Sequence, residues 1–371
     1  MNDILTVGAY DRDNFGDILF YILISKILPE IRFIPGGFST TSKNAVFNEN
    51  VLPYPALMNV NKWRKVLVVG GEVGGVTIKD ANRMLMDEVF EQTYMSVSKE
   101  IERLYDKSMC FEPSYVTAAY IPNSTSANSE FILMSSGLSS LENLPVKVMT
   151  DAIESLKRYK RIWVRDKSSH IFCNNHKIIS ELQPDLVHSI SKIYKKKSKQ
   201  KPEKSYIAFQ MSKEYIEKNS AGEIIDSISR IIKLTNKNVI LFAAGTAPYH
   251  DSIVLYEEIK KGVDDKRLTL NKERDPLSIV RLIANSDAVV GTSLHVRIVA
   301  ISYNIPRISL DIKKVSQYCG YWDENFPFNI NIKDVSDYLG AIKITKESRE
   351  KSRQLTEKAY STVKEFVTGV S

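Results

Sequence analysis

The pattern of hydrophobic and polar positions divides the first half of the chain into alternating strands and helices. Short apolar runs that end in glycine or polar residues, such as ILTVGAY (4–10), are typical of strands buried in a parallel sheet. Segments with the helical spacing of apolar residues separate these runs. The predicted strands are 4–10, 31–37, 161–166 and two that begin the segments 65–75 and 131–141, where the first runs into a glycine turn and the second into a small-residue loop. The predicted helices are 18–28, about 80–105 and 149–160. This alternation indicates βαβ units and a largely parallel sheet.

A basic segment interrupts the pattern. Residues 193–205, IYKKKSKQKPEKS, are mostly polar, include Pro202 and show no apolar periodicity, so we predict an interdomain linker. Aromatic residues are sparse there, which favours a solvated linker over a nucleic-acid-binding segment.

After the linker the alternation of strands and helices restarts. The predicted strands are 206–212, 238–245, 267–271, 287–293 and 306–311, and the predicted helices are 222–235, 249–262, 275–285 and 294–303. A charged helix over about 346–368 ends the chain, and it carries Leu355, Ala359, Val363 and Phe366 on one stripe. The second half is therefore predicted to be another α/β domain.

Chain length agrees with two domains, because 371 residues exceed the size of about 250–300 at which a single core stops growing. We predict an N-terminal α/β domain over 1–192, the linker 193–205, a second α/β domain over 206–340 and a C-terminal helix within 341–371 that closes back. The expected fold class is α/β, with two doubly wound, Rossmann-like domains facing across a cleft, as in the GT-B fold of many glycosyltransferases. Because open α/β sheets bind ligands outside the carboxyl ends of their strands, we expect the active site in that cleft.

Composition and charge indicate which binding partners and which cellular compartment to expect. The net charge of +7 suggests anionic partners, although a solvated lysine-rich surface explains it equally well. The three cysteines are scattered and form no CxxC pair or Cys/His cluster, so neither disulfides nor a metal site is expected and a reducing cytoplasm fits best. No signal-peptide pattern and no apolar run of about 18 residues is found, while the positive charge would allow a peripheral position at the inner membrane face.

The first candidate motif, NFGD (14–17), lies between a predicted strand and its helix. Gly16 permits a tight turn, and the free N–H groups of the helix N-terminus could bind an anion or a sugar oxygen. Asp17 could accept a hydrogen bond from a sugar hydroxyl. The alternative is that Asn14 or Asp17 caps the helix.

Four glycines follow the next buried strand, in VVGGEVGG (68–75). The segment is neither a GxGxxG motif nor a Walker A loop, so it gives little support to a dinucleotide site. The glycines, Gly70 and Gly71 among them, would allow close approach of the backbone to a ligand, and a simple tight turn is an equal alternative.

Two further candidates follow strands. Arg165 ends the strand RIWV and could grip a carboxylate or phosphate with paired donors, or it could form a surface ion pair. His295 begins a helix after the strand DAVV. A helix N-terminus disfavours an imidazolium, so the ring is expected to be neutral until an anionic ligand restores its proton. Ser293 and the helix N–H groups could hold such an anion, while a purely structural histidine is the alternative.

Taken in order, NFGD (14–17), GGE (70–72), VRDKSS (164–169) and the block GTSLHVRIVAISYNIPRISL (291–310) resemble the polysaccharide pyruvyl transferase family. The resemblance covers roughly residues 1–320. It implies a GT-B-like fold and transfer of the pyruvyl group of phosphoenolpyruvate to two hydroxyls of a sugar. The product would be a cyclic ketal, with release of phosphate.

The resemblance also implies roles for residues of this chain. His295 and Asp17 would be catalytic, with His295 protonating the enol methylene or relaying a proton. The donor-binding residues would be Arg165, Ser293, Arg297 and Lys314, and the acceptor-binding residues would be Asn14, Gly16, Gly70, Gly71 and Glu72. No cofactor or metal is implied, since phosphoenolpyruvate is a co-substrate.

One position departs from the family pattern. Many members have arginine two residues before the histidine, where this chain has Ser293, which cannot neutralise a phosphate. Arg297 points about 200° around the helix from His295 and is a poor substitute, so Lys314 or a neighbouring cation would have to supply the charge.

The sequence therefore predicts a cytoplasmic transferase that ketalises a sugar of a surface polysaccharide, such as a capsule or exopolysaccharide of the cell envelope, or of its lipid-linked precursor. Its expected partners are phosphoenolpyruvate and a saccharide acceptor, with peripheral membrane contact and no nucleic acid. A GT-B glycosyltransferase that uses a nucleotide-sugar is the alternative enzyme. The Ser293 departure also leaves open a non-enzymatic member that binds a glycan or another enzyme.

Overall fold

The chain folds as two compact units. We analysed a computed structural model, which describes residues 3–43, 46–60, 63–85, 116–124, 128–196 and 205–369. The first unit comprises Met1–Leu186 with Ser361–Ser371, and the second comprises Val187–Tyr360. Among the described residues, no helix is both long enough and apolar enough to cross a membrane.

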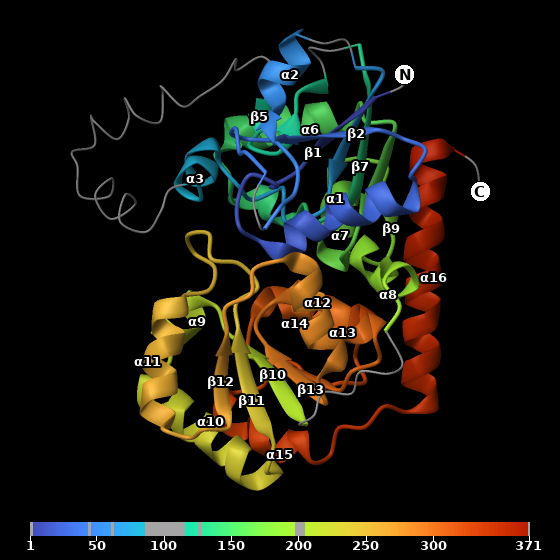
Figure 1. The fold of residues 1–371 in the computed structure, drawn as a ribbon. Helices are drawn as coiled ribbons and strands as arrows, with labels where there is room; N and C mark the ends of the chain where they lie inside the picture. The colour runs from blue at the N-terminus through green and yellow to red at the C-terminus, as the bar shows by residue number, and fades with distance from the viewer. Residues whose placement is uncertain are drawn as a thin grey trace, which may run out of the picture. The chain divides into compact units, whose positions relative to one another are not determined.

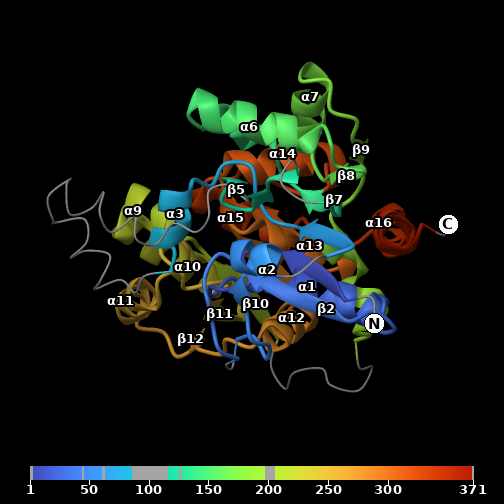
Figure 2. The ribbon, with the colours of Figure 1, turned by 90° about the horizontal axis from the view of Figure 1, so that it is seen from above.

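The first unit is built around a parallel sheet of seven strands in the described part of the chain, in the order β3-β2-β1-β4-β7-β8-β9. Its strands are β1 (Ile4–Val7), β2 (Phe33–Gly37), β3 (Leu52–Pro53), β4 (Lys65–Val69), β7 (Glu130–Ser136), β8 (Arg161–Val164) and β9 (Glu181–Leu182), and β5 (Val116–Ala118) and β6 (Ile121–Pro122) form a separate hairpin. Its helices are α1 (Phe15–Ile27), α2 (Tyr54–Val60), α3 (Ile78–Arg83), α6 (Val146–Leu156) and α7 (Lys167–Asn175), with the 3₁₀ turn η3 (Ser139–Asn143). Helices α6 and α7 lie on the opposite side of the sheet from α1 (Figure 2).

The second unit contains a five-stranded parallel sheet in the order β12-β11-β10-β13-β14 (Figure 1). Its strands are β10 (Tyr206–Gln210), β11 (Asn238–Phe242), β12 (Leu268–Asn271), β13 (Ala288–Gly291) and β14 (Arg307–Ser309). Its helices are α8 (Ile190–Ile193), α9 (Lys213–Lys218), α10 (Ala221–Thr235), α11 (Ile253–Val263), α12 (Pro276–Asn285), α13 (Leu294–Ser302), α14 (Lys313–Trp322), α15 (Val335–Leu339) and the part of α16 (Lys346–Thr368) before Ser361, with 3₁₀ turns η4 (Leu186–Ser189) and η5 (Ile332–Asp334). Helices α10 and α11 cover one face, and α12 and α13 cover the other.

Both sheets contain a topological switch point, where the strand order reverses beside the first strand of the sheet. In the first unit it lies between β1 and β4, and in the second between β10 and β13. Ligands of doubly wound folds bind outside the carboxyl ends of the strands at such points. The loops that follow these four strands are therefore the places where a site is expected.

The apolar periodicity of the sequence agrees with the observed elements. For example, the predicted helix 275–285 is α12, which begins with Pro276 at its first position and is capped by the side chain of Asp275. The predicted helix over 80–105 corresponds at its start to α3, and residues 86–115 lie outside the described residues. Most of the predicted linker, residues 197–204, also lies outside them.

The compact units divide earlier than the predicted boundary at residue 192. Residues from Val187 onward belong to the second unit because they bond to α13 and its end: Ser302 Oγ donates to the carbonyl of His188 (2.7 Å), and the Tyr303 hydroxyl donates to that of Tyr194. The last turns of α16 belong to the first unit, where Phe366 packs edge-on against Trp163, with ring centroids 5.6 Å apart.

Candidate functional site

The switch point of the first unit carries the NFGD motif. Asn14 is the N-cap of α1: its Oδ1 accepts a hydrogen bond from the backbone N–H of Gly16 (3.1 Å), and its Nδ2 donates to Asp17 Oδ2 (2.8 Å). Asp17 Oδ2 also forms an ion pair with Arg12 Nη2, at 3.7 Å. Asn14 therefore caps the helix, which is the alternative that the sequence left open. Asp17, whose side chain is 10% exposed, is held in a fixed orientation by both neighbours.

The glycine turn after β4 lies against this motif. Gly70 and Gly71 have φ angles of 75° and 73°, a region that side chains other than glycine adopt at a cost. A Cβ atom at Gly70 would lie 2.0 Å from the ring of Phe20 on α1, and one at Gly71 would lie 2.9 Å from Asp17 Oδ1. The two glycines therefore allow the β4 turn to approach α1 and bring the backbone next to the Asp17 carboxylate.

Replacement of Gly70 by alanine is expected to destabilise the protein by at least about 2 kcal/mol. The positive φ alone costs about 1–2 kcal/mol, and the overlap with Phe20 adds to it. Urea denaturation measures the difference. Gly340→Ala is the matched control, because φ is −74° there and a Cβ would meet no atom within 4 Å; its stability should change by no more than about 1 kcal/mol. Equal effects at the two positions would contradict the proposed strain.

Glu72 and Arg165 meet at the ends of β4 and β8. Glu72 Oε1 accepts a hydrogen bond from Ser140 Oγ (2.5 Å), and its Oε2 lies 3.5 Å from Arg165 Nη2. Arg165 Nη1 donates to Asp185 Oδ2 (3.2 Å) in a pair whose side chains are 1% and 0% exposed. Burial by itself lowers the pKa of Arg165, but the carboxylates of Asp185 and Glu72 outweigh it and raise this pKa, so the guanidinium stays charged.

The position of Arg165 differs from the expected donor-binding role. Neither a phosphate nor a carboxylate from solvent can contact a guanidinium that is 1% exposed and flanked by two carboxylates unless side chains move. The surface ion-pair alternative is also not what is found, since the pair with Asp185 is fully buried. Arg165 instead neutralises Asp185 and lies 3.5 Å from Glu72 Oε2. The Glu72 side chain remains 26% exposed.

In the second unit, Gln210 organises the switch point. Its Oε1 accepts hydrogen bonds from the backbone N–H groups of Thr292 (3.0 Å) and Ser293 (2.9 Å), which follow β13. Its Nε2 donates to Asp251 Oδ1 (2.8 Å), and Asp251 Oδ2 accepts from the N–H of Ala244 after β11 (2.7 Å). One side chain at the end of β10 thus ties together the loops on both sides of it.

These bonds fix the start of α13. Ser293 is the N-cap of the helix, and its hydroxyl accepts from the N–H of Val296 (3.4 Å). His295 lies in the first turn and is 9% exposed. Lys314 is exposed in the first turn of α14, after β14. The structure therefore brings Ser293 and His295 together at a helix N-terminus, where partial positive charge favours an anion.

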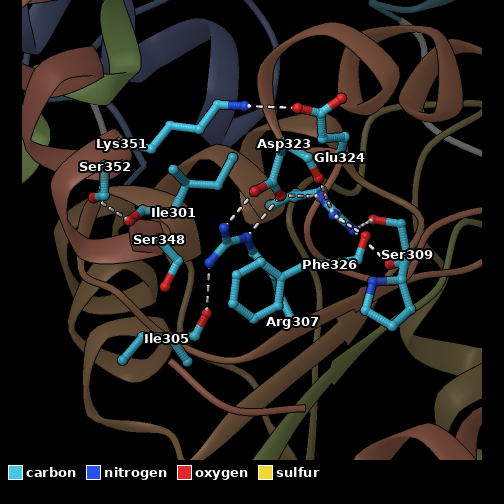
Figure 3. A network of polar contacts seen from close by, with 12 residues as sticks. Ile301, Ile305, Arg307, Ser309, Asp323, Glu324, Phe326, Ser348, Lys351 and Ser352 are labelled. Atoms are coloured by element: carbon cyan, nitrogen blue, oxygen red, sulfur yellow. Dashed lines mark hydrogen bonds and ion pairs between the residues drawn. The ribbon is translucent and has the colours of Figure 1, made fainter. Parts of the chain in front are cut away.

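Arg297 is placed in an internal network and not toward the helix start. Its five N–H donors are all used: Nε donates to Asp323 Oδ2 (2.7 Å), Nη1 to Ser309 Oγ and the carbonyl of Pro327, and Nη2 to the carbonyls of Asp323 and Phe326. Figure 3 shows the same network around Arg307, which donates to both carboxylate oxygens of Asp323. This arrangement differs from the expected donor-binding role of Arg297, because a guanidinium with no spare donor has nothing to offer a phosphate.

Sequence reasoning missed Gln210, which carried no motif although it stands at the carboxyl end of a strand. The segments TAPYHDS (246–252) and ELQPDLV (181–187) favour a helix cap for Asp251 and a turn for Asp185. The structure differs, because Ser252 caps that helix while Asp251 bonds to Gln210 and Asp185 pairs with Arg165. Within the described ranges, no group of three or more histidine, cysteine, aspartate or glutamate residues is arranged to hold a metal ion.

Comparison with known proteins finds a family model that matches most of the chain. The family model described as polysaccharide pyruvyl transferase matches residues 14–314. No curated protein matches the chain.

Among solved structures, the chain resembles Staphylococcus aureus MnaA in complex with UDP (13% identity, TM-score 0.58, covering 100% of this chain and 98% of that one). It also resembles the UDP-GlcNAc 2-epimerase of Neisseria meningitidis bound to UDP-GlcNAc (11%, 0.56, 99% and 100%) and Anabaena HepE in complex with UDP-glucose (12%, 0.53, 98% and 95%). At these identities the likeness shows the fold alone, and it confirms the predicted class of GT-B-like α/β proteins. The cleft expected between the two halves stays a prediction.

Proposed function

The chain belongs to the polysaccharide pyruvyl transferase family, and from that premise we propose that it transfers the pyruvyl group of phosphoenolpyruvate to two hydroxyls of a saccharide. The family membership makes the protein a transferase that modifies polysaccharides. Phosphoenolpyruvate as the donor, and a surface polysaccharide or its lipid-linked precursor as the acceptor, are the specific parts of the proposal. A cytoplasmic protein with peripheral contact at the inner membrane face would have access to such a precursor.

The single observation that carries the proposal is the extent of the family match. It begins at Asn14, in the loop after β1, and ends at Lys314, in the first turn of α14 after β14, so it includes the switch points of both units. The residues expected to bind the donor and the acceptor therefore all fall inside the part of the chain that is similar to the family.

The proposed reaction contains proton transfers by His295 and Asp17. His295 gives a proton to the methylene carbon of phosphoenolpyruvate, and the central carbon of the donor then forms a bond to a sugar oxygen whose proton passes to Asp17. A second sugar hydroxyl attacks the same carbon as the bond from this carbon to the phosphate oxygen breaks. The proton of this hydroxyl passes to the leaving phosphate. The products are a cyclic ketal that carries a methyl and a carboxylate group, and inorganic phosphate.

In this proposal the donor binds at the start of α13. Arg165 and Arg297 are engaged internally, so the negative charge of the donor would be met by the N–H groups and hydroxyl at Ser293, by His295 and by the exposed Lys314. A helix N-terminus and one lysine replace the arginine that many members have at position 293.

Release of inorganic phosphate from phosphoenolpyruvate tests the reaction. The protein would be incubated with phosphoenolpyruvate and a panel of methyl glycosides and lipid-linked saccharides, and the product would be identified by mass spectrometry. Phosphate release that depends on an acceptor, with a ketal in the product, is the expected result. The absence of release with every acceptor, together with consumption of a nucleotide-sugar, would overturn the proposal.

A nucleotide-sugar transferase remains the second candidate, because the structural neighbours MnaA and HepE were solved with UDP and UDP-glucose. Thermal shifts separate the two, since a ligand that binds the native state raises Tm according to its concentration relative to Kd. A rise in Tm with phosphoenolpyruvate and none with UDP or UDP-glucose is expected.

A further inference from the structure

The second unit contains a groove along helix α12 that has no part in the proposed reaction. It is lined by residues 193–196, by Tyr303 and by one face of α12, and we call it the α12 groove. Helix α13, which ends next to Tyr303, packs against both α12 and α8 (Figure 1). The volume of the groove is about 370 Å³, within the range of about 300–1,000 Å³ that is usual for small-molecule sites.

One wall of the groove is a single face of α12. Its lining residues lie at positions i, i+3, i+4, i+7 and i+8 of the helix, and they are Leu277, Val280, Arg281, Ala284 and Asn285. At 1.5 Å per residue this face extends over about 12 Å. Val280 and Ala284 are buried, Leu277 is half-buried and Arg281 is exposed. The wall therefore has an apolar base and a cation at its rim.

The opposite wall continues the apolar lining. Ile193 and Tyr194 line it together with Tyr303, whose hydroxyl donates to the carbonyl of Tyr194 and ties this segment to the end of α13. Burial raises the pKa of Tyr194 and that of Tyr303, so both hydroxyls stay neutral and add no negative charge. The rings of the two tyrosines offer apolar surface to a ligand.

The charged side chains that line the groove are all cations. They are the exposed Lys195, Lys196 and Arg281, and no aspartate or glutamate of the described residues lines it. Neither lysine forms an ion pair within the described part of the chain. Arg281 Nη2 lies 3.5 Å from Asp275 Oδ2, but both side chains are exposed, and such a pair leaves the guanidinium open to another anion. The groove thus presents a net positive charge, the sign of the whole chain.

Apolar walls beside several cations match an amphiphile with a hydrocarbon chain and an anionic head. A soluble sugar or a free phosphate has no hydrocarbon to bury on the apolar walls, and a basic segment of a protein would be repelled by the cations. A phospholipid with an acidic headgroup supplies both parts, since its chain gains by leaving water and its phosphate attracts lysine and arginine.

We propose that the α12 groove binds an acidic phospholipid of the membrane. An acyl chain would lie along α12, and the headgroup phosphate would contact Lys195, Lys196 and Arg281. The inference deepens the proposed function, and rests on it only in placing the acceptor on a lipid, because it names the surface that would bring the second unit to the membrane that holds such an acceptor.

Co-sedimentation of the full chain with vesicles tests the inference and requires neither phosphoenolpyruvate nor an acceptor. The protein should bind vesicles made of phosphatidylcholine and phosphatidylglycerol in equal amounts, and bind phosphatidylcholine alone far more weakly. Replacement of Lys195, Lys196 and Arg281 together by glutamine should weaken binding to the mixed vesicles about 10²-fold, or about fivefold for each basic side chain. These side chains are exposed, so the triple variant should fold normally.

Replacement of Arg230, Lys260 and Lys261 together by glutamine is the matched control. These residues are exposed in the same unit and do not line the groove, and Arg230 forms an exposed ion pair just as Arg281 does. The control loses the same charge and should bind the vesicles as the unmodified protein does.

A second pair of variants tests the apolar wall. Leu277→Gln should weaken vesicle binding about fivefold, because part of the hydrocarbon contact is lost. Leu234→Gln should have no effect, since Leu234 is 63% exposed on α10 and does not line the groove.

Four outcomes would overturn the inference. They are equal binding to the two kinds of vesicle or to neither, equal losses in the two triple variants, unchanged binding by Leu277→Gln, and displacement of the vesicles by an excess of glycerol phosphate. The last would show a site for a soluble anion. If vesicles bind as expected while no acceptor supports phosphate release, the membrane surface stands and the proposed reaction fails.

Discussion

Replacement of His295 by glutamine is expected to lower kcat for phosphate release from phosphoenolpyruvate by a factor of about 10²–10⁴, the usual contribution of general acid–base catalysis. Glutamine is similar in size to histidine and can still form hydrogen bonds, but it cannot transfer a proton. The fold should be unaffected, because Ser293 caps α13 and Gln210 fixes the loop before it without using the imidazole. Steady-state kinetics with a saturating acceptor measures the effect.

Two measurements give this prediction its specificity. The KM for phosphoenolpyruvate should change much less than kcat if His295 mainly transfers a proton, since in the proposed site the helix N-terminus and Lys314 would still bind the anion. His176→Gln is the matched control, because His176 lies at the end of α7 in the first unit, where its ring is tilted against that of Phe172 with centroids 4.5 Å apart. The control should keep full activity. A His295→Gln variant with near-normal kcat would instead favour the structural alternative.

The sequence predicts the helices, the strands and the strand ends, because these depend on the local pattern of apolar and polar residues. The run DAVVGTS predicts a buried strand followed by small residues, and the structure shows β13 and the start of α13 there. In a parallel sheet this local information is enough to predict that Asn14, Gly70 and Arg165 lie along one edge, since every loop after a strand lies at that edge.

The charge partners could not be read in the same way. Arg165 pairs with Asp185, 20 positions later in the chain, and Arg297 pairs with Asp323, 26 positions later. The helical angle already made Arg297 a poor substitute for the missing arginine, but nothing near either arginine in the sequence indicates an internal ion pair. The ion-pair partners depend on tertiary packing. Both guanidinium groups form internal ion pairs instead of the expected contacts with the donor.

Replacement of Asp323 by asparagine is expected to lower the free energy of unfolding by about 3–5 kcal/mol. Asp323 is 4% exposed and lies between the buried guanidinium groups of Arg297 and Arg307 (Figure 3). Without the carboxylate, two buried positive charges face each other with no counter-charge, although their bonds to backbone carbonyls remain. Urea denaturation of the second unit's transition measures the loss. Asp337→Asn removes an exposed pair with Arg230 (2.7 Å) and should cost about 0–1 kcal/mol.

The contribution of Asp323 should also depend on pH with a definite sign. Burial by itself raises the pKa of Asp323, but Arg297 and Arg307 outweigh it and lower this pKa below its value in the unfolded chain. A carboxylate with a lowered pKa stabilises the fold above the unfolded value, near pH 4, and this stabilisation is lost as the pH falls through the folded value. The stability difference between the unmodified protein and Asp323→Asn should therefore be constant from about pH 5 to 8 and shrink below about pH 4. A difference that stayed constant down to pH 2 would show that the ion pairs do not stabilise the fold through the charge of Asp323.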